Sequence, residues 1–206
     1  MVDLSEEKNA IGLKWVYKTK FATYGSLEKH KARLVAKGYA QQHGIDFKEI
    51  FSPVARFETV KIVLALAAQQ QWSIYQFDVK SAFLNGELQE EVYVERPEGF
   101  VKKDSEEKVY KLTKALYGLK QASRTWYSKI DGYFQQNGSK RSGNEPTLYV
   151  KKGGKNDFII VSLYVDDIIY TSSFKSLVAE FKSYMKNKFE MTDLGLLHFF
   201  LGLEVW

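Results

Sequence analysis

The fold prediction starts from one stretch, Leu163-Tyr164-Val165-Asp166-Asp167-Ile168-Ile169-Tyr170. Its two adjacent carboxylates lie between apolar runs, Phe158–Val161 before them and Ile168–Tyr170 after them. Runs this short and this rich in β-branched and aromatic residues are typical of strands. We therefore predict a tight β-hairpin with Asp166 and Asp167 at its turn. The alternative is an ordinary solvated turn, in which aspartate is common, although two adjacent like charges add no stability to a turn.

The composition of the chain narrows the class of protein. Its 206 residues are 45% hydrophobic and 27% charged, which is typical of a globular protein with one large domain or two lobes. There is no cysteine, so disulfides and thiolate zinc sites are excluded, and the three histidines show no metal-ligand spacing. No apolar run approaches the roughly 20 residues that cross a bilayer, so we expect no membrane partner. The net charge of +5 permits a polyanionic partner.

Cations gather in the N-terminal part of the chain. Two segments with alternating side chains, residues 14–21 and 27–37, flank a loop that contains Gly25, which predicts a hairpin. This region carries one acid, Glu28, against the cations Lys14, Lys18, Lys20, Lys29, Lys31, Arg33 and Lys37. A basic hairpin is suited to clamp phosphates. The alternative is a solvated edge that lysines protect from aggregation.

The other segments alternate between expected strands and helices. We predict helices over residues 59–71, from Ala122 onward and after Ser172, each with one apolar face. We predict strands over residues 72–79, 92–94 and 109–112, and a final hairpin over residues 196–206. This order indicates an α+β or α/β fold in which a compact sheet is backed by helices.

Three carboxylates form the candidate site. Asp78 ends a predicted strand, and Asp166 and Asp167 occupy the hairpin turn. If these residues converge, their like charges need compensation, and Mg²⁺ prefers carboxylate oxygens and substrate phosphates. Two such ions about 3.5–4 Å apart clamp the attacking and leaving oxygens of a phosphoryl transfer. The residue types therefore suggest two-metal chemistry, with the convergence left for a structure to test.

Several motifs, in order, resemble the reverse transcriptase of copia-type LTR retrotransposons. They are Lys31–Gly38, Phe51–Val54, Phe77–Gly86, Ala115–Ala122, Tyr164–Asp167 and Leu201–Val205. The resemblance covers the chain from about Lys14 to Val205 with the spacing of the family. It implies an α+β fingers-and-palm fold, with an antiparallel palm sheet backed by helices and a basic fingers hairpin. Residues 1–13 would then be an N-terminal extension and residues 14–206 the fingers and palm, without thumb, connection or RNase H.

The resemblance also implies roles for individual residues. Asp78, Asp166 and Asp167, with the backbone of Val79, would bind two catalytic Mg²⁺ ions, or Mn²⁺ in their place. The dNTP would contact Arg33, Lys18, Lys20, Phe83, Gly118 and Lys120, with Phe83 crowding a ribose 2′-OH and Arg33 on the triphosphate. Which lysine accompanies Arg33 depends on a hairpin register that the sequence leaves open, and Phe83 has core packing as its alternative. Template and primer would contact Tyr164, Gln121, Leu201 and Gly202.

The implied reaction is attack of a primer 3′-OH on the α-phosphate of a dNTP opposite an RNA or DNA template. The implied partners are this template with its primer, dNTPs, and the RNase H, integrase and protease of a parent Pol polyprotein. The implied location is a cytoplasmic virus-like particle, with nuclear entry of the product.

Three serines depart from the family pattern. Ser123 replaces a proline, Ser139 an aromatic residue that would fill the core, and Ser172 a glycine, which would strain the backbone if φ is positive there. Two alternatives to a polymerase stay open, and these departures favour the first of them. One is an inactive retrotransposon remnant that folds and binds nucleic acid, and the other is a different two-metal palm enzyme, such as a nucleotide cyclase.

Overall fold

A computed structural model describes residues 1–206 except 5–7, 23, 101–107 and 155–156. The chain divides into two compact units. Unit 1 comprises Met1–Phe51 and Phe83–Trp126, and unit 2 comprises Ser52–Ala82 and Tyr127–Trp206. In the part of the chain that is described, no helix is long and apolar enough to span a bilayer.

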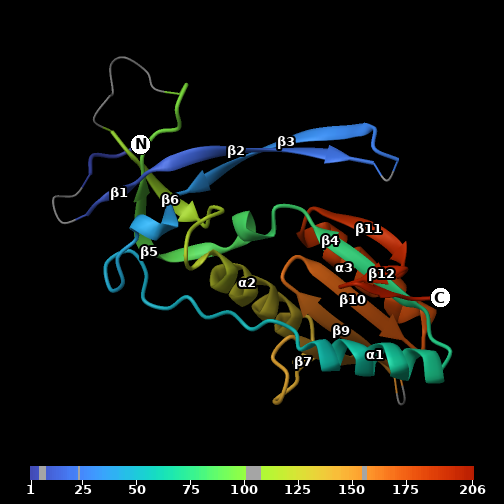
Figure 1. Cartoon of the computed structure of the whole chain (residues 1–206). Coiled ribbons are helices and arrows are strands. Elements are labelled where there is room, and N and C mark those ends of the chain that lie inside the picture. Colours follow the sequence, from blue (N-terminus) through green and yellow to red (C-terminus); the bar gives the residue numbers. More distant parts are fainter. Residues whose placement is uncertain (5–7, 23, 101–107, 155–156) are drawn as a thin grey trace. The chain divides into compact units, whose positions relative to one another are not determined.

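Unit 2 is built on an antiparallel sheet with the strand order β11-β4-β10-β9-β8-β7 (Figure 1). Its strands are β4 (Ile74–Val79), β7 (Lys140–Arg141), β8 (Leu148–Lys152), β9 (Phe158–Tyr164), β10 (Asp167–Ser172) and β11 (Met191–Leu196). A separate small hairpin follows, formed by β12 (Phe199–Phe200) and β13 (Leu203–Glu204). The central strands β9 and β10 are almost wholly buried, which explains why their sequences are continuous apolar runs.

Helices pack on the two faces of this sheet. Phe181, on α3 (Lys175–Lys188), contacts Phe77 and Tyr170 on one face. Val60 and Ala67, on α1 (Phe57–Gln69), are buried in the cluster that contains Ile74 and Ile169 of the other face. Because side chains alternate along a strand, Asp78 lies on the same face as Ile74 and away from α3.

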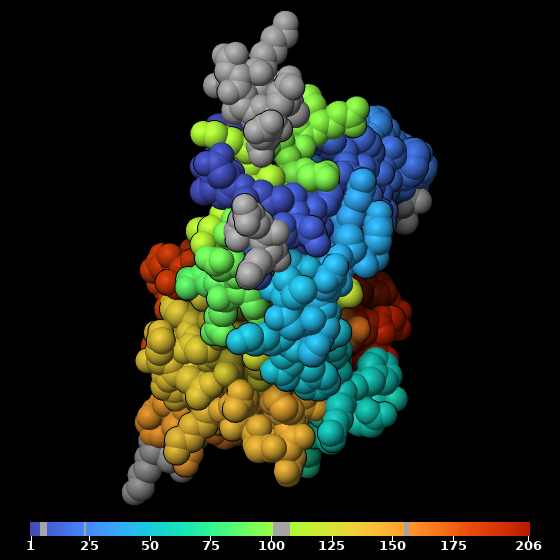
Figure 2. Space-filling model, turned by 90° about the vertical axis from the view of Figure 1, so that its left-hand side faces the viewer, coloured from blue at the N-terminus to red at the C-terminus, as the bar shows by residue number. Residues whose placement is uncertain are grey.

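The helix α2 (Ala122–Gln136) begins in unit 1 and ends in unit 2. In unit 2, its residue Phe134 is fully buried against Tyr149 of β8, with ring centroids 4.7 Å apart. The end of α2 and the β7–β8 segment, gold and orange in Figure 2, lie side by side on the face shown. The aromatic face of this helix is therefore core packing, as the sequence predicts.

Unit 1 contains two sheets. One has the strand order β1-β5-β6, formed by β1 (Ala10–Ile11), β5 (Glu87–Val94) and β6 (Tyr110–Lys114). The other is the hairpin of β2 (Leu13–Phe21) and β3 (Leu27–Ala36). Short 3₁₀ helices form at Gly38–Ala40 and, across the boundary between the units, at Ala82–Asn85. Ile11 is buried and pairs with Val94, so part of the expected N-terminal extension is a strand of this sheet.

Most elements agree with the sequence-based expectations. The three helices and the hairpins around residues 14–37 and 158–170 are all present. The last hairpin is shorter than expected, because Leu196 belongs to β11. The strands β8 and β11 were not predicted.

Candidate active site

Asp78 and Asp167 form a cross-strand pair. Asp78 on β4 is the register partner of Asp167 on β10. Directly opposite residues of an antiparallel pair have their Cβ atoms about 4.5–5.5 Å apart on one face. Asp166 lies in the two-residue loop between β9 and β10, and its carbonyl oxygen accepts a 2.8 Å hydrogen bond from the Val79 N–H. The expected approach of Asp78 to the Asp-Asp turn is thus observed at the level of the backbone.

The turn itself has an unfavourable backbone conformation. Of its two central residues, only Val165 has a positive φ, at 56°. This is the pattern of a type II′ turn, which prefers glycine at its first central position. A β-branched residue there costs roughly 1–3 kcal/mol and persists only where the surrounding structure imposes it. At Val165 this conformation is imposed by the strand pairing of Tyr164 with Asp167 and by the hydrogen bond from the Val79 N–H to the Asp166 carbonyl oxygen.

The surroundings of Asp167 oppose its ionisation. Burial raises the pKa of this carboxyl, and the charges of Asp166 and Asp78 raise it further. One hydrogen bond acts in the other direction, from Gln76 Nε2 to Asp167 Oδ1 at 2.9 Å. Sequence reasoning missed Gln76, although its position two residues before Asp78 places both side chains on one face of β4.

The donor chemistry of these three residues fits a hard divalent cation. Carboxylate oxygens are the ligands that Mg²⁺ prefers, and a cation would relieve the repulsion that raises the pKa of Asp167. Within the described ranges, however, no three His, Asp or Glu side chains are already gathered as a metal site. The buried Val79 contributes its N–H to Asp166, and its predicted role as a metal ligand stays a prediction.

A second element of unit 2 adjoins the turn. The ring of Tyr164 packs edge to face against Phe200 of β12, with centroids 6.2 Å apart. The next two residues, Leu201 and Gly202, form the β12–β13 turn with φ values of 49° and 82°. Three of the residues predicted to contact template or primer (Tyr164, Leu201 and Gly202) are therefore linked through one aromatic contact.

The register of β2 and β3 is now fixed. Arg33 lies opposite Val16, Lys18 opposite Lys31, and Lys20 opposite Lys29. Because opposite residues and every second residue share a face, one face of the hairpin carries the cations Lys14, Lys18, Lys20, Lys29, Lys31 and Arg33. Of the two candidate lysines, Lys18 is the nearer to Arg33 in register, because it lies two residues after Val16, the residue opposite Arg33.

In unit 1, Arg33 and Phe83 both contact a residue that sequence reasoning missed. The ring centroid of Tyr117 is 5.1 Å from the guanidinium carbon of Arg33 and 5.2 Å from the ring centroid of Phe83. Phe83 is also packed against the apolar core of this unit. The only sequence signal for Tyr117 is its position directly before Gly118 in the motif Ala115–Ala122.

Gly118 has a clear backbone reason to be glycine. Its φ is +90°, and a Cβ there would lie 2.1 Å from the carbonyl oxygen of Ala36. Gly38 approaches from the same segment, since its own Cβ would lie 1.9 Å from the Gly118 carbonyl oxygen. The two glycines allow the loop after β6 to pack directly on the end of β3.

A buried amide network holds the residues after Gly118. Gln41 Oε1 accepts the Lys120 N–H at 2.8 Å, and Gln41 Nε2 donates to Gln121 Oε1 at 3.0 Å. Gln121 Nε2 in turn donates to the carbonyl oxygen of Asp46 at 2.8 Å. Gln121 is completely buried, so its side chain supports this loop from inside, and its predicted contact with template or primer stays a prediction. Lys120 remains exposed, with its ammonium group bonded to the Gln41 carbonyl oxygen.

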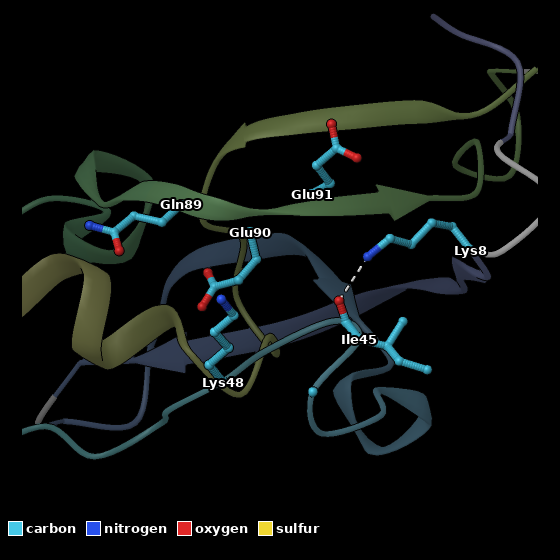
Figure 3. Close-up of a pocket in the computed structure, with 7 residues that line it drawn as sticks. Lys8, Ile45, Lys48, Gln89, Glu90 and Glu91 are labelled. Carbon is cyan, nitrogen blue, oxygen red and sulfur yellow. Dashed lines mark hydrogen bonds between the residues drawn. The ribbon is translucent and has the colours of Figure 1, made fainter.

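A hollow of about 260 Å³ lies elsewhere in unit 1 (Figure 3). Lys8 and Lys48 contribute positive charge to its wall and Glu90 and Glu91 negative charge, and Lys8 Nζ donates to the Ile45 carbonyl oxygen at 2.8 Å. The mixed charge gives this hollow no preference for a phosphate group. None of the sequence-predicted site residues lines it.

The structure answers the expectation about Ser172. Its φ is not positive, so the anticipated strain is absent, and its hydroxyl donates to the Phe158 carbonyl oxygen at 2.7 Å. Ser139 is 4% exposed, so this small polar side chain occupies a buried position where a larger apolar side chain would pack. Nothing in the structure explains Ser123.

Comparisons with known proteins give the family. The family described as "Reverse transcriptase (RNA-dependent DNA polymerase)" matches residues 1–206. The retrovirus-related Pol polyprotein from transposon TNT 1-94 of Nicotiana tabacum is 42% identical over 100% of this chain and 15% of its own length. That from transposon RE1 of Arabidopsis thaliana is 42% identical over 94% of this chain and 13% of its own length. The transposon Ty1-BR Gag-Pol polyprotein of Saccharomyces cerevisiae is 32% identical over 85% of this chain and 10% of its own length.

The chain thus spans about a seventh of its plant relatives' length, and its similarity to these copia-type elements confirms the resemblance predicted from the sequence. Together with the match of the whole sequence to the family, this similarity shows that the chain belongs to the reverse transcriptase (RNA-dependent DNA polymerase) family.

Proposed function

We propose that this chain is the RNA-directed DNA polymerase domain of a retrotransposon Pol polyprotein and adds dNTPs to a primer 3′-OH. In this proposal residues 14–206 form the fingers and the palm. Unit 2 is the palm, and unit 1, which contains the β2–β3 hairpin, supplies the fingers. The observation that carries the proposal is the pairing of Asp78 with Asp167 beside the turn that holds Asp166. A fold gains no stability from opposing two like charges, so this pairing favours a functional role.

Asp78, Asp166 and Asp167 would hold two Mg²⁺ ions. When bound, these ions neutralise charge on the reacting phosphate and lower the pKa of the attacking hydroxyl. The chain's own contribution is to fix the carboxylates. The bond from Val79 and the strand pairing hold the backbone, and Gln76 orients one oxygen of Asp167. Such positioning accounts for much of the catalysis in phosphoryl transfer.

The basic face of the β2–β3 hairpin would bind the triphosphate. Arg33 and Lys18 are its nearest pair of predicted contacts, and Lys20 continues the same row. Phe83 would exclude a ribose 2′-OH, and the loop with Gly118 and Lys120 would line the nucleotide pocket. Tyr164 and the turn at Leu201 and Gly202 would hold the primer end. Base choice then comes from pairing with the template, and the protein needs little readout of base edges.

The relatives are named as Pol polyproteins, and the family resemblance supplies the further partners of this proposal. As part of a Pol polyprotein, the chain would work with an RNase H, an integrase and a protease. It would act inside a cytoplasmic particle, with nuclear entry of the DNA product.

The test is dTTP incorporation on poly(rA)/oligo(dT) with Mg²⁺. The wild-type chain is compared with Asp166→Ala/Asp167→Ala and with Glu180→Ala. Glu180 pairs with Lys151 on the surface of unit 2 and controls for loss of an acid, because an exposed ion pair contributes little stability. We expect incorporation by the wild type and by Glu180→Ala, and none by the double variant.

Incorporation that survives the double variant would contradict the assignment of the aspartates. Template–primer binding by a folded wild type without incorporation would favour the inactive remnant. Conversion of NTPs to cyclic products would point to a cyclase.

A further inference from the structure

Tyr117 contacts two residues that the proposed function gives separate tasks. The guanidinium carbon of Arg33 lies 5.1 Å from the centroid of its ring, within the range of a cation–π interaction. The ring of Phe83 lies 5.2 Å away at an interplanar angle of 55°. All three residues belong to unit 1, and they come from three distant segments of its chain.

The backbone of Tyr117 is held firmly. Its carbonyl oxygen accepts a 2.7 Å hydrogen bond from the N–H of Ala36, the last residue of β3. The following residue, Gly118, makes the close approach to Ala36 described above. The backbone of Tyr117, whose ring is half-buried, is therefore hydrogen-bonded to β3, the strand that carries Arg33.

We propose that Tyr117 is a positioning residue that holds Arg33 and Phe83 in one arrangement, coupling triphosphate binding to selection of the sugar. This inference rests on the proposed function. Arg33 is exposed and has a long, flexible side chain, so its placement needs a partner. The face of an aromatic ring supplies that partner without neutralising the charge that a triphosphate would bind.

The same ring would limit movement of Phe83. The core of unit 1 contacts one part of Phe83, and Tyr117 contacts its ring. A side chain that rejects a 2′-OH by crowding must stay in place when the larger sugar pushes against it. Loss of the Tyr117 ring would free both side chains at once, so the KM for the nucleotide and the sugar preference should change together.

The test uses Tyr117→Leu, which removes the ring, and Tyr117→Phe, which keeps it. Tyr39→Leu serves as the matched control, because Tyr39 is 77% exposed in the same unit. For each variant we measure the KM and kcat for dTTP and for UTP on poly(rA)/oligo(dT). We also measure the Kd for dTTP of the protein bound to this template–primer, and the melting temperature of the protein.

We expect Tyr117→Leu to raise the KM and Kd for dTTP about three- to thirtyfold, the range that a lost cation–π contact gives. Its preference for dTTP over UTP should fall about tenfold, as expected for loss of an aromatic pair. Tyr117→Phe should stay within about twofold of the wild type, because the ring face is retained. The combination Arg33→Met/Tyr117→Leu should be no worse in KM than Arg33→Met alone.

An active wild type whose Tyr117→Leu variant shows only a lower melting temperature would overturn this inference alone, since plain core packing predicts that outcome. A change in KM without a change in sugar preference would remove the coupling to Phe83. A wild type that neither incorporates nor binds dTTP would overturn the proposed function, and this inference with it.

Discussion

Asp78 lies directly opposite Asp167 on the antiparallel strands β4 and β10, so two carboxylates of like charge share one cross-strand position. Opposed like charges destabilise a sheet by up to about 1 kcal/mol. Burial is the main cause of the raised pKa of Asp167, and the charges of Asp166 and then Asp78 add to it, so only a part of the raised pKa reflects this repulsion. The site therefore stores a repulsion that a bound cation would remove.

Removal of one charge should separate stability from activity. In EDTA, Asp167→Asn should raise the free energy of unfolding by about 0.5–1 kcal/mol, because the repulsion is lost while an amide oxygen remains for Gln76. Incorporation should fall by at least roughly 10²-fold, since a metal ligand is gone. Thermal melts with and without Mg²⁺ check this prediction: the ion should stabilise the wild type more than the variant. An equal shift in both would contradict metal binding by Asp167.

Local patterns predicted much of this fold, and long-range pairings could not be predicted in the same way. The hairpin around Asp166 follows from turn residues between apolar runs. Strand β11 was missed because Asp193 and Gly195 are residue types that strands disfavour. It forms through its pairing with β4, which is distant in the sequence. The candidate site shows the same division between what is local and what is long-range. The identity of Asp78 is visible in the sequence, but its register with Asp167, and the contact of Arg33 with Tyr117, depend on how distant segments pack.

A buried carboxylate should make the stability of unit 2 depend on pH. Glu145 is 6% exposed and accepts hydrogen bonds from Thr147 Oγ1 at 2.7 Å and from Thr59 Oγ1 and the Arg56 N–H at the start of α1. Burial opposes its ionisation, but the hydrogen bonds from Thr147, Arg56 and Thr59 prevail and hold the pKa of this carboxyl below its ordinary value. The ionised form is thus favoured in the folded state.

Glu145→Gln should lower the free energy of unfolding by about 1–3 kcal/mol at pH 7, because the charged acceptor at the helix start is lost. A depressed pKa contributes stability above the unfolded value of about 4.3 and loses it as the pH falls through the lower folded value. Urea unfolding from pH 7 to pH 3 should therefore show the difference between wild type and variant shrinking below about pH 4.3. Glu58→Gln, an exposed acid in the first turn of α1, is the control and should cost at most about 1 kcal/mol. A difference that is constant with pH would show that Glu145 acts without its charge.

The amide network of unit 1 should depend on Gln41. Gln41→Met keeps the size of the side chain but removes the hydrogen bonds that Gln41 makes to the Lys120 N–H and to Gln121 Oε1. Each buried group that loses its hydrogen bond costs about 1–3 kcal/mol, so we expect a clear loss of stability in this unit. Hydrogen exchange of the Lys120 amide measures it directly, and its protection should fall at least roughly tenfold. The neighbouring Gln42→Met is exposed and should leave that protection unchanged. Equal protection in wild type and Gln41→Met would show that the loop is held without the Gln41 side chain.

The end of α1 offers a change that should stabilise the chain. Gln71, which follows the C-cap residue Gln70, has a φ of 55°, and the N–H groups of Gln71 and Trp72 donate to the carbonyl oxygens of Ala68 and Ala67, respectively. This is the hydrogen-bond pattern of a Schellman motif, whose left-handed position favours glycine. Gln71→Gly should therefore raise the free energy of unfolding by about 0.5–1 kcal/mol, since the steric cost of a side chain in this conformation disappears. Gln70→Gly, one residue earlier with a φ of −90°, should instead lower it by about 0.5–1 kcal/mol through added backbone entropy. Urea unfolding of both variants separates the two effects. Destabilisation by both would mean that the exposed side chain of Gln71 contributes more than its backbone strain costs.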